Sequence, residues 1–297
     1  MILLGGEQTA PNLLPARYFK PERVYILHTD FWKSKQMAER LSLRLVGMYP
    51  ELVPIDAYDP GKITEQIRSL LHGVSDILVN ITGGTKPMSL GALEAARQAG
   101  WQPFYVKSQG GKTDLDFYSF SQIGTPLIKE SITISDTITL EDYLVAYFGT
   151  EFQITGFGIG AGKTFEQTIY ETLEPSVDEI AVGWKHASGA VDVDFVVRCN
   201  NQVGIIEAKT GGKARTTEGI KQLAIAGGQR FFGTYTRRFL VIDQTWSETS
   251  NNRALAEAID IALIELPSYA TSGKISTLEK GKLVGAVQKA LGRPVKE

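Results

Sequence analysis

The sequence has a single cysteine, Cys199, and only three histidines, which lie far apart in the chain. One cysteine cannot form an internal disulfide bond, and structural zinc sites need several cysteine and histidine ligands at short spacings. The sequence also lacks any run of about 20 apolar residues, and its first residues lack the basic flank and apolar core of a signal peptide. These absences exclude a disulfide-stabilised fold, and we expect a cytoplasmic protein that does not interact with membranes.

An excess of either charge is also lacking, because 31 lysines and arginines nearly balance 33 aspartates and glutamates and leave a net charge of −2. Any surface that attracts nucleic acid therefore has to be local. One candidate lies between residues 207 and 238, where Phe231, Phe232 and Tyr235 alternate with basic side chains. These basic residues are Lys209, Lys213, Arg215, Lys221, Arg230, Arg237 and Arg238. The composition suits a groove with stacking surfaces for a nucleic-acid strand, or a charged helix face above buried aromatic side chains.

The chain of 297 residues is long enough for two domains, and 43% of its residues are hydrophobic. In the first half, strand-like and helix-like segments alternate, which predicts a mostly parallel sheet covered by helices. The expected strands are residues 2–4, 23–29, 52–55, 76–81, 101–107 and 114–120, and the expected helices are 33–46, 62–71 and 87–99. Residues 7–15 contain two prolines and are expected to form a loop. A capped helix at 138–149 ends at Gly149, where we place the domain boundary.

A glycine-rich turn, TGGTK at residues 82–86, follows the apolar strand-like run at 76–81 and precedes the helix expected at 87–99. The glycines leave backbone N–H groups free at a helix N-terminus, and Lys86 adds a positive charge, so an anion could bind there. The carboxyl ends of strands are also where open α/β sheets bind ligands. The alternative is a tight strand-to-helix turn without a ligand. GIGAGKT at 158–164 is not a P-loop, because the glycine required at position 157 is Phe157.

GGEQTAPNLLPARY near the N-terminus and NITGGTKPMSLGALEAA, which contains this turn, together resemble the CRISPR-associated Rossmann fold (CARF) domains. CARF domains sense cyclic oligoadenylates. The resemblance implies a homodimer whose two-fold axis passes through the ligand, with the loop after the first strand and the TGGTK loop of each subunit holding the ring. The candidate contacts that it implies are Gln8, Thr9, Asn12, Gly83, Gly84, Thr85 and Lys86.

A strand, a tight turn and a second strand are expected over residues 191–209. Asn200 and Asn201 suit a two-residue turn, because asparagine tolerates the positive φ that primed turns require at both central positions. That turn pairs Cys199 with Gln202 and Val197 with Gly204. With a side-chain period of two, one face is then apolar and the other is polar. The apolar face carries Val191, Val193, Phe195, Val197, Ile206 and Ala208, and the polar face carries Asp192, Asp194, Glu207 and Lys209.

The same register places Asp194 opposite Glu207, with Cβ atoms roughly 5 Å apart, where like charges repel. Mg²⁺ or Mn²⁺ between them would remove the repulsion, since these ions prefer carboxylate and water oxygens, and could stabilise a phosphate under attack. Lys209 could then orient the nucleophile or neutralise that phosphate. The alternative is a solvated hairpin face with an ordinary pair between Asp192 and Lys209.

Asp194 together with Glu207-Ala208-Lys209 resembles the motif of the PD-(D/E)xK nucleases. The order helix, strand, hairpin, helix, strand is that of their restriction-endonuclease-like core. EAKTGG, IKQLAIAGGQR and RRFLVID further resemble the nuclease half of the CARF-fused CRISPR ancillary nucleases. The resemblance implies Glu166, on a helix at 163–173, as a further acidic residue of the site. Lys221 and Gln222 are possible substrate contacts, and a bulge in the hairpin would exchange the roles of Asp192 and Asp194.

We therefore expect an α/β protein with a CARF sensor domain at 1–149 and a PD-(D/E)xK nuclease domain at 150–297. The expected function is a nuclease that uses Mn²⁺ or Mg²⁺, is activated by cyclic tetra-adenylate and hydrolyses DNA or RNA in type III CRISPR defence. The ring size of the activator follows from the resemblance alone. A nuclease unrelated to signalling and a ligand-responsive nucleic-acid-binding regulator without cleavage activity remain the alternatives.

Overall fold

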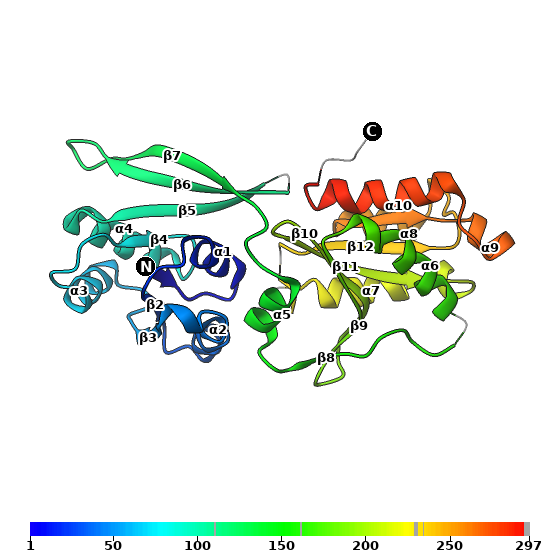
Figure 1. Cartoon of the computed structure of the whole chain (residues 1–297), viewed down its shortest axis with the longest axis horizontal. Helices are drawn as coiled ribbons and strands as arrows, with labels where there is room; N and C mark the ends of the chain where they lie inside the picture. Colours follow the sequence, from blue (N-terminus) through cyan, green and yellow to red (C-terminus); the bar gives the residue numbers. More distant parts are fainter. Residues whose placement is uncertain (110, 161, 229–230, 234, 294–297) are drawn as a thin grey trace. The chain divides into compact units, whose positions relative to one another are not determined.

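The computed structural model describes residues 1–109, 111–160, 162–228, 231–233 and 235–293 (Figure 1). The chain divides into two compact units, Met1–Gly149 and Thr150–Glu297. Each unit is built around its own sheet of parallel and antiparallel strands. None of the helices within the described ranges is long and apolar enough to span a membrane. Arg230, one of the basic residues singled out from the sequence, lies outside these ranges.

The N-terminal sheet has seven strands in the order β3-β2-β1-β4-β5-β6-β7. Its strands are β1 (Ile2–Leu4), β2 (Val24–His28), β3 (Pro50–Pro54), β4 (Leu78–Asn80), β5 (Gln102–Gln109), β6 (Lys112–Phe120) and β7 (Pro126–Ile134). The first five strands in that order are parallel, as the alternation of elements predicts, and β6 and β7 continue antiparallel. The sequence did not predict β7, because this edge strand is exposed on both faces over most of its length and alternates between polar and apolar residues only over its last four positions.

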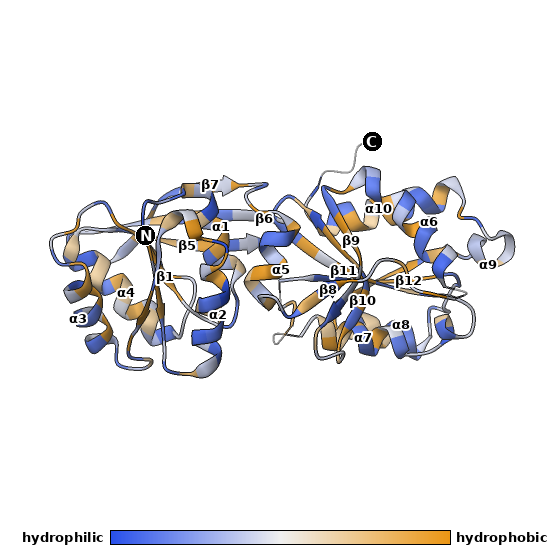
Figure 2. Cartoon of the chain, turned by 60° about the horizontal axis from the view of Figure 1, so that its bottom comes forward, coloured by the Kyte–Doolittle hydropathy of each residue, from blue (hydrophilic) through white to orange (hydrophobic). Residues whose placement is uncertain are grey.

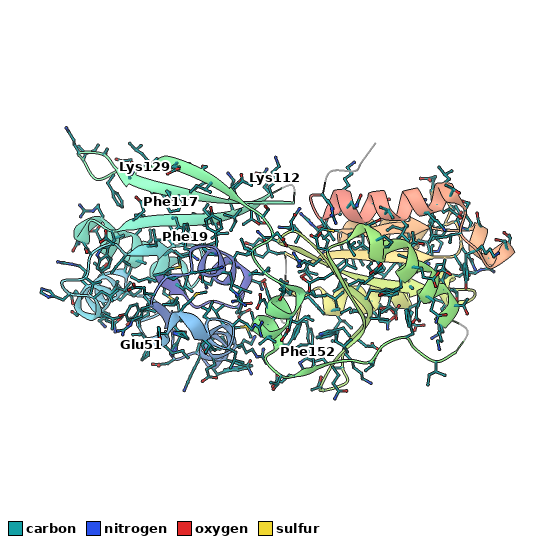
Figure 3. The ribbon with its side chains drawn as sticks, viewed as in Figure 1. Phe19, Glu51, Lys112, Phe117, Lys129 and Phe152 are labelled. Carbon is teal, nitrogen blue, oxygen red and sulfur yellow. The ribbon has the colours of Figure 1, made fainter. Side chains whose placement is uncertain are left out.

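The helices of this domain are α1 (Ala10–Phe19), α2 (Trp32–Ser42), α3 (Pro60–Leu70), α4 (Lys86–Ala99) and α5 (Leu140–Phe148), with a 3₁₀ turn at Val46–Met48. The expected start of α4 and the capping box of α5 are confirmed, with Thr139 accepting from the backbone N–H of Asp142. The end of α1 packs on the sheet, where Phe19 meets Phe117 of β6 edge-on with ring centroids 6.1 Å apart (Figure 3).

Helix α1 corrects the expectation of a loop over residues 7–15, because the helix begins at Ala10 and contains Pro15. Proline lacks the N–H that would bond the carbonyl of Pro11 in a regular helix. The Asn80 side chain supplies that donor instead, with Nδ2 2.8 Å from the Pro11 carbonyl and 2.9 Å from Asn12 Oδ1. A buried amide on β4 therefore replaces the missing helical hydrogen bond.

The C-terminal sheet has the order β13-β12-β11-β10-β9-β8. Its elements are β8 (Phe152–Ile154), α6 (Lys163–Leu173), β9 (Glu179–His186), β10 (Asp192–Cys199), β11 (Gln202–Lys209), α7 (Glu218–Ala226), β12 (Arg237–Ile242), α8 (Asn251–Ala258), β13 (Ile261–Glu265), α9 (Ser268–Ser272) and α10 (Thr277–Ala290), with 3₁₀ turns at Glu174–Ser176 and Lys213–Arg215. The predicted order of helix, strand, hairpin, helix and strand is confirmed, as is α6 over its full length. The sequence did not predict β8, α8 and β13.

The β10–β11 hairpin has the predicted register, with Cys199 paired to Gln202 and Val197 to Gly204. Asn200 takes a φ of 53°, whereas Asn201 does not have a positive φ. The turn therefore has a positive φ at only one of its two central positions, whereas the sequence predicted a positive φ at both. One face of the hairpin packs into a core with α6 and α10, and Figure 2 shows hydrophobic residues along the strands of the sheet. The opposite face carries the polar residues of the hairpin.

We predict that Asn80→Ala destabilises the N-terminal domain, because it leaves the carbonyl of Pro11 and the Oδ1 of Asn12 without their donor. Each unsatisfied buried acceptor costs on the order of 1–3 kcal/mol. Urea unfolding followed by circular dichroism measures the loss. Gln98→Ala, which removes an exposed amide from the same domain, should change the unfolding free energy little. Equal stabilities of the two variants would contradict the role of Asn80.

Candidate functional site

Three polar side chains of the hairpin gather on its second face. The backbone N–H of Ala208 donates to Asp194 Oδ2 at 2.7 Å, which places Asp194 between the side chains that flank Ala208. Lys209 Nζ donates to Glu207 Oε1. Glu207 is 2% exposed and Lys209 is 9% exposed. The alternative of a solvated hairpin face is therefore wrong, since this acidic and basic pair is buried.

Helix α7 covers this face, and a glycine lets it approach. A Cβ at Gly219 would lie 2.6 Å from Leu240 Cδ1 and 3.3 Å from Lys209 Cγ, so a side chain there would require Leu240 and Lys209 to shift. One turn further along, Gln222 Oε1 is buried without a hydrogen-bond partner among the described residues, whereas Lys221 is exposed. Of the two candidate substrate contacts, Gln222 thus lies on the side of the helix that carries Gly219.

The pKa values of the two carboxyl groups differ strongly from those of free side chains. Burial raises the pKa of Asp194 to about 6, with smaller contributions from Glu166 and Asp192, against the opposing effects of the Ala208 N–H and Lys209. Burial and the nearby Asp194 raise the pKa of Glu207 to about 8. Burial alone would lower the pKa of Lys209, but its carboxylate neighbours, Glu207 above all, outweigh burial and raise it. The site therefore combines a lysine that keeps its charge with two carboxyl groups that ionise reluctantly.

Glu166 lies on α6, and the short segment before this helix packs on β9 and holds the Glu166 side chain near the site. Gly183 has a φ of 70°, and a Cβ on it would lie 2.1 Å from the carbonyl oxygen of Gly156, so Gly156 packs directly against this glycine. In the β9–β10 ladder Gly183 lies between Val182, which pairs with Phe195, and Trp184, which pairs with Val193. The N–H of Gly158 then donates to Glu166 Oε2 at 3.3 Å. The loop thus holds Glu166 close enough to raise the pKa of Asp194.

Asp192 and Asp194 have different surroundings. Asp192 is exposed and pairs across the ladder with Lys185 of β9. Asp194 is half-buried and accepts the Ala208 N–H beside Glu207. The β10–β11 register continues without a bulge as far as Phe195 and Ile206. The structure therefore brings Asp194, rather than Asp192, to Glu207.

One carboxylate oxygen of this site is a suitable ligand for a divalent cation. Glu207 Oε2 is buried and has no hydrogen-bond partner among the described residues, and carboxylate oxygens are the ligands that Mg²⁺ and Mn²⁺ prefer. Within the same residues, no group of three or more histidine, cysteine, aspartate and glutamate side chains is arranged to hold a metal ion. Asp194 and Glu207 are thus the pair available to an ion, and water or substrate oxygens would complete its shell.

The basic segment singled out from the sequence is only partly a surface. Phe232 is fully buried, with its ring centroid 4.6 Å from that of Trp184, so it belongs to the core. Tyr235 is 41% exposed and Lys221 is exposed. Arg215 donates to Gln244 at 2.8 Å. The exposed residues of this segment stay candidates for substrate contacts.

In the N-terminal domain, two glycine pairs meet at the carboxyl ends of the neighbouring strands β1 and β4. A Cβ at Gly83 would lie 2.1 Å from the carbonyl oxygen of Leu4, and a Cβ at Gly6 would lie 2.9 Å from the backbone nitrogen of Gly84. The two loops therefore touch through their backbones, which only glycine permits. The backbone N–H groups of Gly6, Gly83 and Gly84 donate no hydrogen bond within the described residues. They are available to an anion.

The TGGTK turn is held in place from several sides. Thr85 caps α4 by accepting from the N–H of Met88, and its hydroxyl donates to the carbonyl of Ala57 at 2.6 Å. Ser89 Oγ donates to the carbonyl of Gly83 at 3.1 Å. Lys86 is exposed at the first position of α4. The turn is thus a fixed loop that carries the exposed Lys86 side chain at a helix N-terminus.

The candidate contacts on the β1 loop lie at different depths. Gln8 is half-buried, and its Oε1 accepts from the hydroxyl of Tyr147 at 3.3 Å. Thr9 is 2% exposed, and its Oγ1 has no hydrogen-bond partner among the described residues. Asn12 is 1% exposed and is bonded to Leu4 and Asn80. Asn80 was missed from the sequence, where its one signal was a polar residue in the apolar run DILVNI.

The N-terminal domain belongs to a known family. Residues 1–143 match the family model described as the Card1 CARF domain, so this part of the chain is a CARF domain, and the expectation from the sequence is confirmed. No curated protein matches the chain.

Solved structures share the fold over the whole chain. Can2 from Sulfobacillus thermosulfidooxidans, in complex with cyclic tetra-adenylate, is 15% identical with a TM-score of 0.72, and VC1899 from Vibrio cholerae is 16% identical with the same score. For both, 98% of this chain and 98% of the other are covered. A type III CRISPR defence DNA nuclease activated by cyclic oligoadenylate is 16% identical with a TM-score of 0.63, and the likeness covers 98% of this chain and 51% of that one. At these identities the comparisons show a common α/β fold with a second domain after the CARF domain.

The raised pKa of Glu207 predicts a stability that depends on pH in metal-free protein. Its pKa is about 8 in the folded state and about 4.3 in an unfolded chain. At pH values between these two pKa values, the Glu207 carboxyl group is protonated in the folded protein and deprotonated in the unfolded chain. The free energy of unfolding of the wild type therefore falls as the pH rises. Glu207→Gln removes this dependence, and its stability relative to wild type should increase from pH 4.5 to pH 8 by up to about 1.4 kcal/mol per pH unit.

Urea unfolding in EDTA at several pH values measures this effect. Glu171→Gln, which changes an exposed glutamate on α6, serves as the matched control, and its stability relative to wild type should not vary with pH. A Glu207→Gln profile parallel to that control would show that Glu207 ionises normally in the folded protein.

Proposed function

We propose that this chain is a metal-dependent nuclease that cyclic tetra-adenylate activates, and that it acts on DNA, RNA or both in type III CRISPR defence. The observation that carries the proposal is the half-buried Asp194 beside the buried Glu207, with Lys209 in contact with Glu207. Two carboxylates that repel each other in a buried site, one with an oxygen lacking a hydrogen bond, are stabilised by a divalent cation. The fold shared with Can2, which was solved in complex with cyclic tetra-adenylate, supports the proposed activator, and the fold shared with a type III CRISPR defence DNA nuclease supports the proposed activity.

Each residue of the site has a proposed task. Asp194 and Glu207 hold Mn²⁺ or Mg²⁺, which when bound supplies positive charge to the phosphate and lowers the pKa of a water molecule. The Ala208 N–H orients the Asp194 carboxylate. Lys209 keeps its proton, because neighbouring carboxylates raise its pKa. Its ammonium group neutralises the scissile phosphate or orients the attacking water. Glu166, fixed by the Gly158 N–H, supplies further negative charge beside the metal, while Asp192 lies at the exposed edge of the site.

For the N-terminal domain, we propose that the glycine loops hold the activator. The free N–H groups of Gly6, Gly83 and Gly84 and the ammonium group of Lys86 suit the phosphates of a cyclic oligonucleotide. Gln8 and Thr9 contact the ring from the β1 loop. Asn12 and Thr85 position the loops, because their side chains form hydrogen bonds with the backbone beneath the loops. A homodimer would bring two copies of this surface to one two-fold ligand.

We predict that Glu207→Gln and Asp194→Asn lower the rate of strand cleavage by about a hundredfold or more, because metal-dependent stabilisation of the transition state is worth several kcal/mol. Labelled DNA and RNA strands are incubated with protein, Mn²⁺ and cyclic tetra-adenylate, and EDTA should stop the reaction. The matched control Glu171→Gln should cleave like wild type. Strand binding without any cleavage by wild type would favour the alternative of a nucleic-acid-binding regulator, and full activity of Glu207→Gln would remove Glu207 from the site.

We predict that Lys86→Ala weakens binding of cyclic tetra-adenylate by about fivefold, since an exposed contact between charges is worth up to roughly 1 kcal/mol. The loss should shrink as salt is added, because salt screens the contact. Calorimetry with the catalytically inactive Glu207→Gln background measures the affinity without cleavage. Lys129→Ala removes an exposed lysine from β7 (Figure 3) and is the control. Identical affinities for the two variants would exclude Lys86 from the ligand site.

A further inference from the structure

Two large aromatic side chains stand exposed at the carboxyl edge of the N-terminal sheet. Phe31 and Trp32 follow β2 and are 51% and 57% exposed. Strand β2 is the parallel neighbour of β1, so the loop after β2 lies beside the glycine loop after β1, about 5 Å away in the sheet. Exposed aromatic rings at a site edge provide faces for stacking. The residues Phe31, Trp32 and Lys33 are called the aromatic edge below.

The aromatic edge is fixed to the loop that begins at Gly5. Ser34 Oγ donates to the carbonyl of Gly5 at 3.0 Å and accepts from the backbone N–H of Thr29 at 3.1 Å. The N–H of Gly5 in turn donates to the carbonyl of Leu27 at 2.7 Å. Ser34 is buried and lies two residues from Trp32 in α2. The backbone that carries Trp32 is therefore tied to the loop that carries Gln8 and Thr9.

Lys33 adds a charge to these rings. Its Nζ lies 5.7 Å from the ring centroid of Trp32 and 6.0 Å from that of Phe31, within the range of a cation–π contact. The same atom lies 4.0 Å from Glu7 Oε1, on the β1 loop. A flat apolar ring with an ammonium group above it matches the two parts of a nucleotide, a base that stacks and a phosphate that needs a cation.

We propose that Trp32, supported by Phe31, stacks on an adenine base of the cyclic oligonucleotide while Lys33 pairs with the adjoining phosphate. The inference rests on the proposed ligand site of the N-terminal domain and adds to it the group that recognises the base. The glycine loops offer backbone N–H groups and Lys86 to phosphates, whereas the aromatic edge offers a ring face to a base. Stacking accepts any base, so this surface contributes affinity rather than selection among bases.

The tryptophans of the chain provide a direct optical test. Of the four, Trp32 is 57% exposed, whereas Trp101, Trp184 and Trp246 are at most 7% exposed. Acrylamide in solution should therefore quench Trp32 selectively. We expect cyclic tetra-adenylate to lower the emission of Trp32 and to protect its remaining emission from acrylamide. Both effects should occur at the ligand concentrations at which calorimetry detects binding.

The variants separate stacking from a general effect on the fold. Trp32→Ala should weaken binding of cyclic tetra-adenylate by about tenfold to a hundredfold, as expected for one lost stacked base, and Trp32→Phe should retain most of the affinity. Tyr49, which is 73% exposed and precedes β3 at the opposite edge of the sheet, provides the control Tyr49→Ala with wild-type affinity. Thermal unfolding verifies that all three variants fold.

The outcomes also distinguish this inference from the proposed function. Binding by wild type with unchanged Trp32 emission, or with equal affinity for Trp32→Ala, would overturn the stacking role and leave the ligand site intact. Failure of wild type to bind cyclic tetra-adenylate would overturn both. Emission from Trp32 that changes with protein concentration and not with ligand would identify the aromatic edge as a contact between copies of the chain, and would likewise overturn the proposal.

Discussion

The C-terminal domain is organised around two neighbouring carboxyl groups, the buried Glu207 and the half-buried Asp194. Removing Glu207 from water costs free energy, Asp194 adds repulsion, and the contact with Lys209 offsets only part of both effects, so the pKa of Glu207 remains about 8. The surrounding structure maintains this strain. The hairpin register sets the two carboxyl groups together, and Gly219 lets α7 exclude water from them. Such an arrangement destabilises the metal-free protein and strengthens binding of any cation that enters it.

The N-terminal domain uses buried amides to hold backbone groups at a sheet edge. Asn80 replaces the hydrogen bond that Pro15 cannot donate, and Asn12 bonds the carbonyl of Leu4 beside Gly83. The glycine loops therefore rest on side-chain amides rather than on a regular ladder. These loops lie at the carboxyl ends of β1 and β4, where open α/β sheets bind ligands. The aromatic edge extends the same surface by one strand.

Local signals explain what the sequence predicted. The Asn200–Asn201 turn, α6 and the start of α4 are each encoded by a few adjacent residues, and the structure has them where expected. Contacts between distant segments explain the failures. Helix α1 depends on an amide that lies 69 residues from Pro11, and the burial of Glu207 depends on a helix that follows it in the chain. The sequence could not exclude a bulge that would exchange Asp192 and Asp194, and the hairpin pairing without a bulge as far as Phe195 and Ile206 decides between them.

The central claim is that Asp194 and Glu207 form a site for a divalent cation, and calorimetric titration of metal-free protein with Mn²⁺ tests it most directly. Because burial raises the pKa of Glu207 to about 8, we expect a cation that binds near neutral pH to displace a proton from this carboxyl group. The account predicts binding by wild type with net proton release, seen as a heat that depends on the ionisation enthalpy of the buffer, and loss of this binding in Glu207→Gln. Absence of binding by wild type, or equal binding by Glu207→Gln, would contradict it.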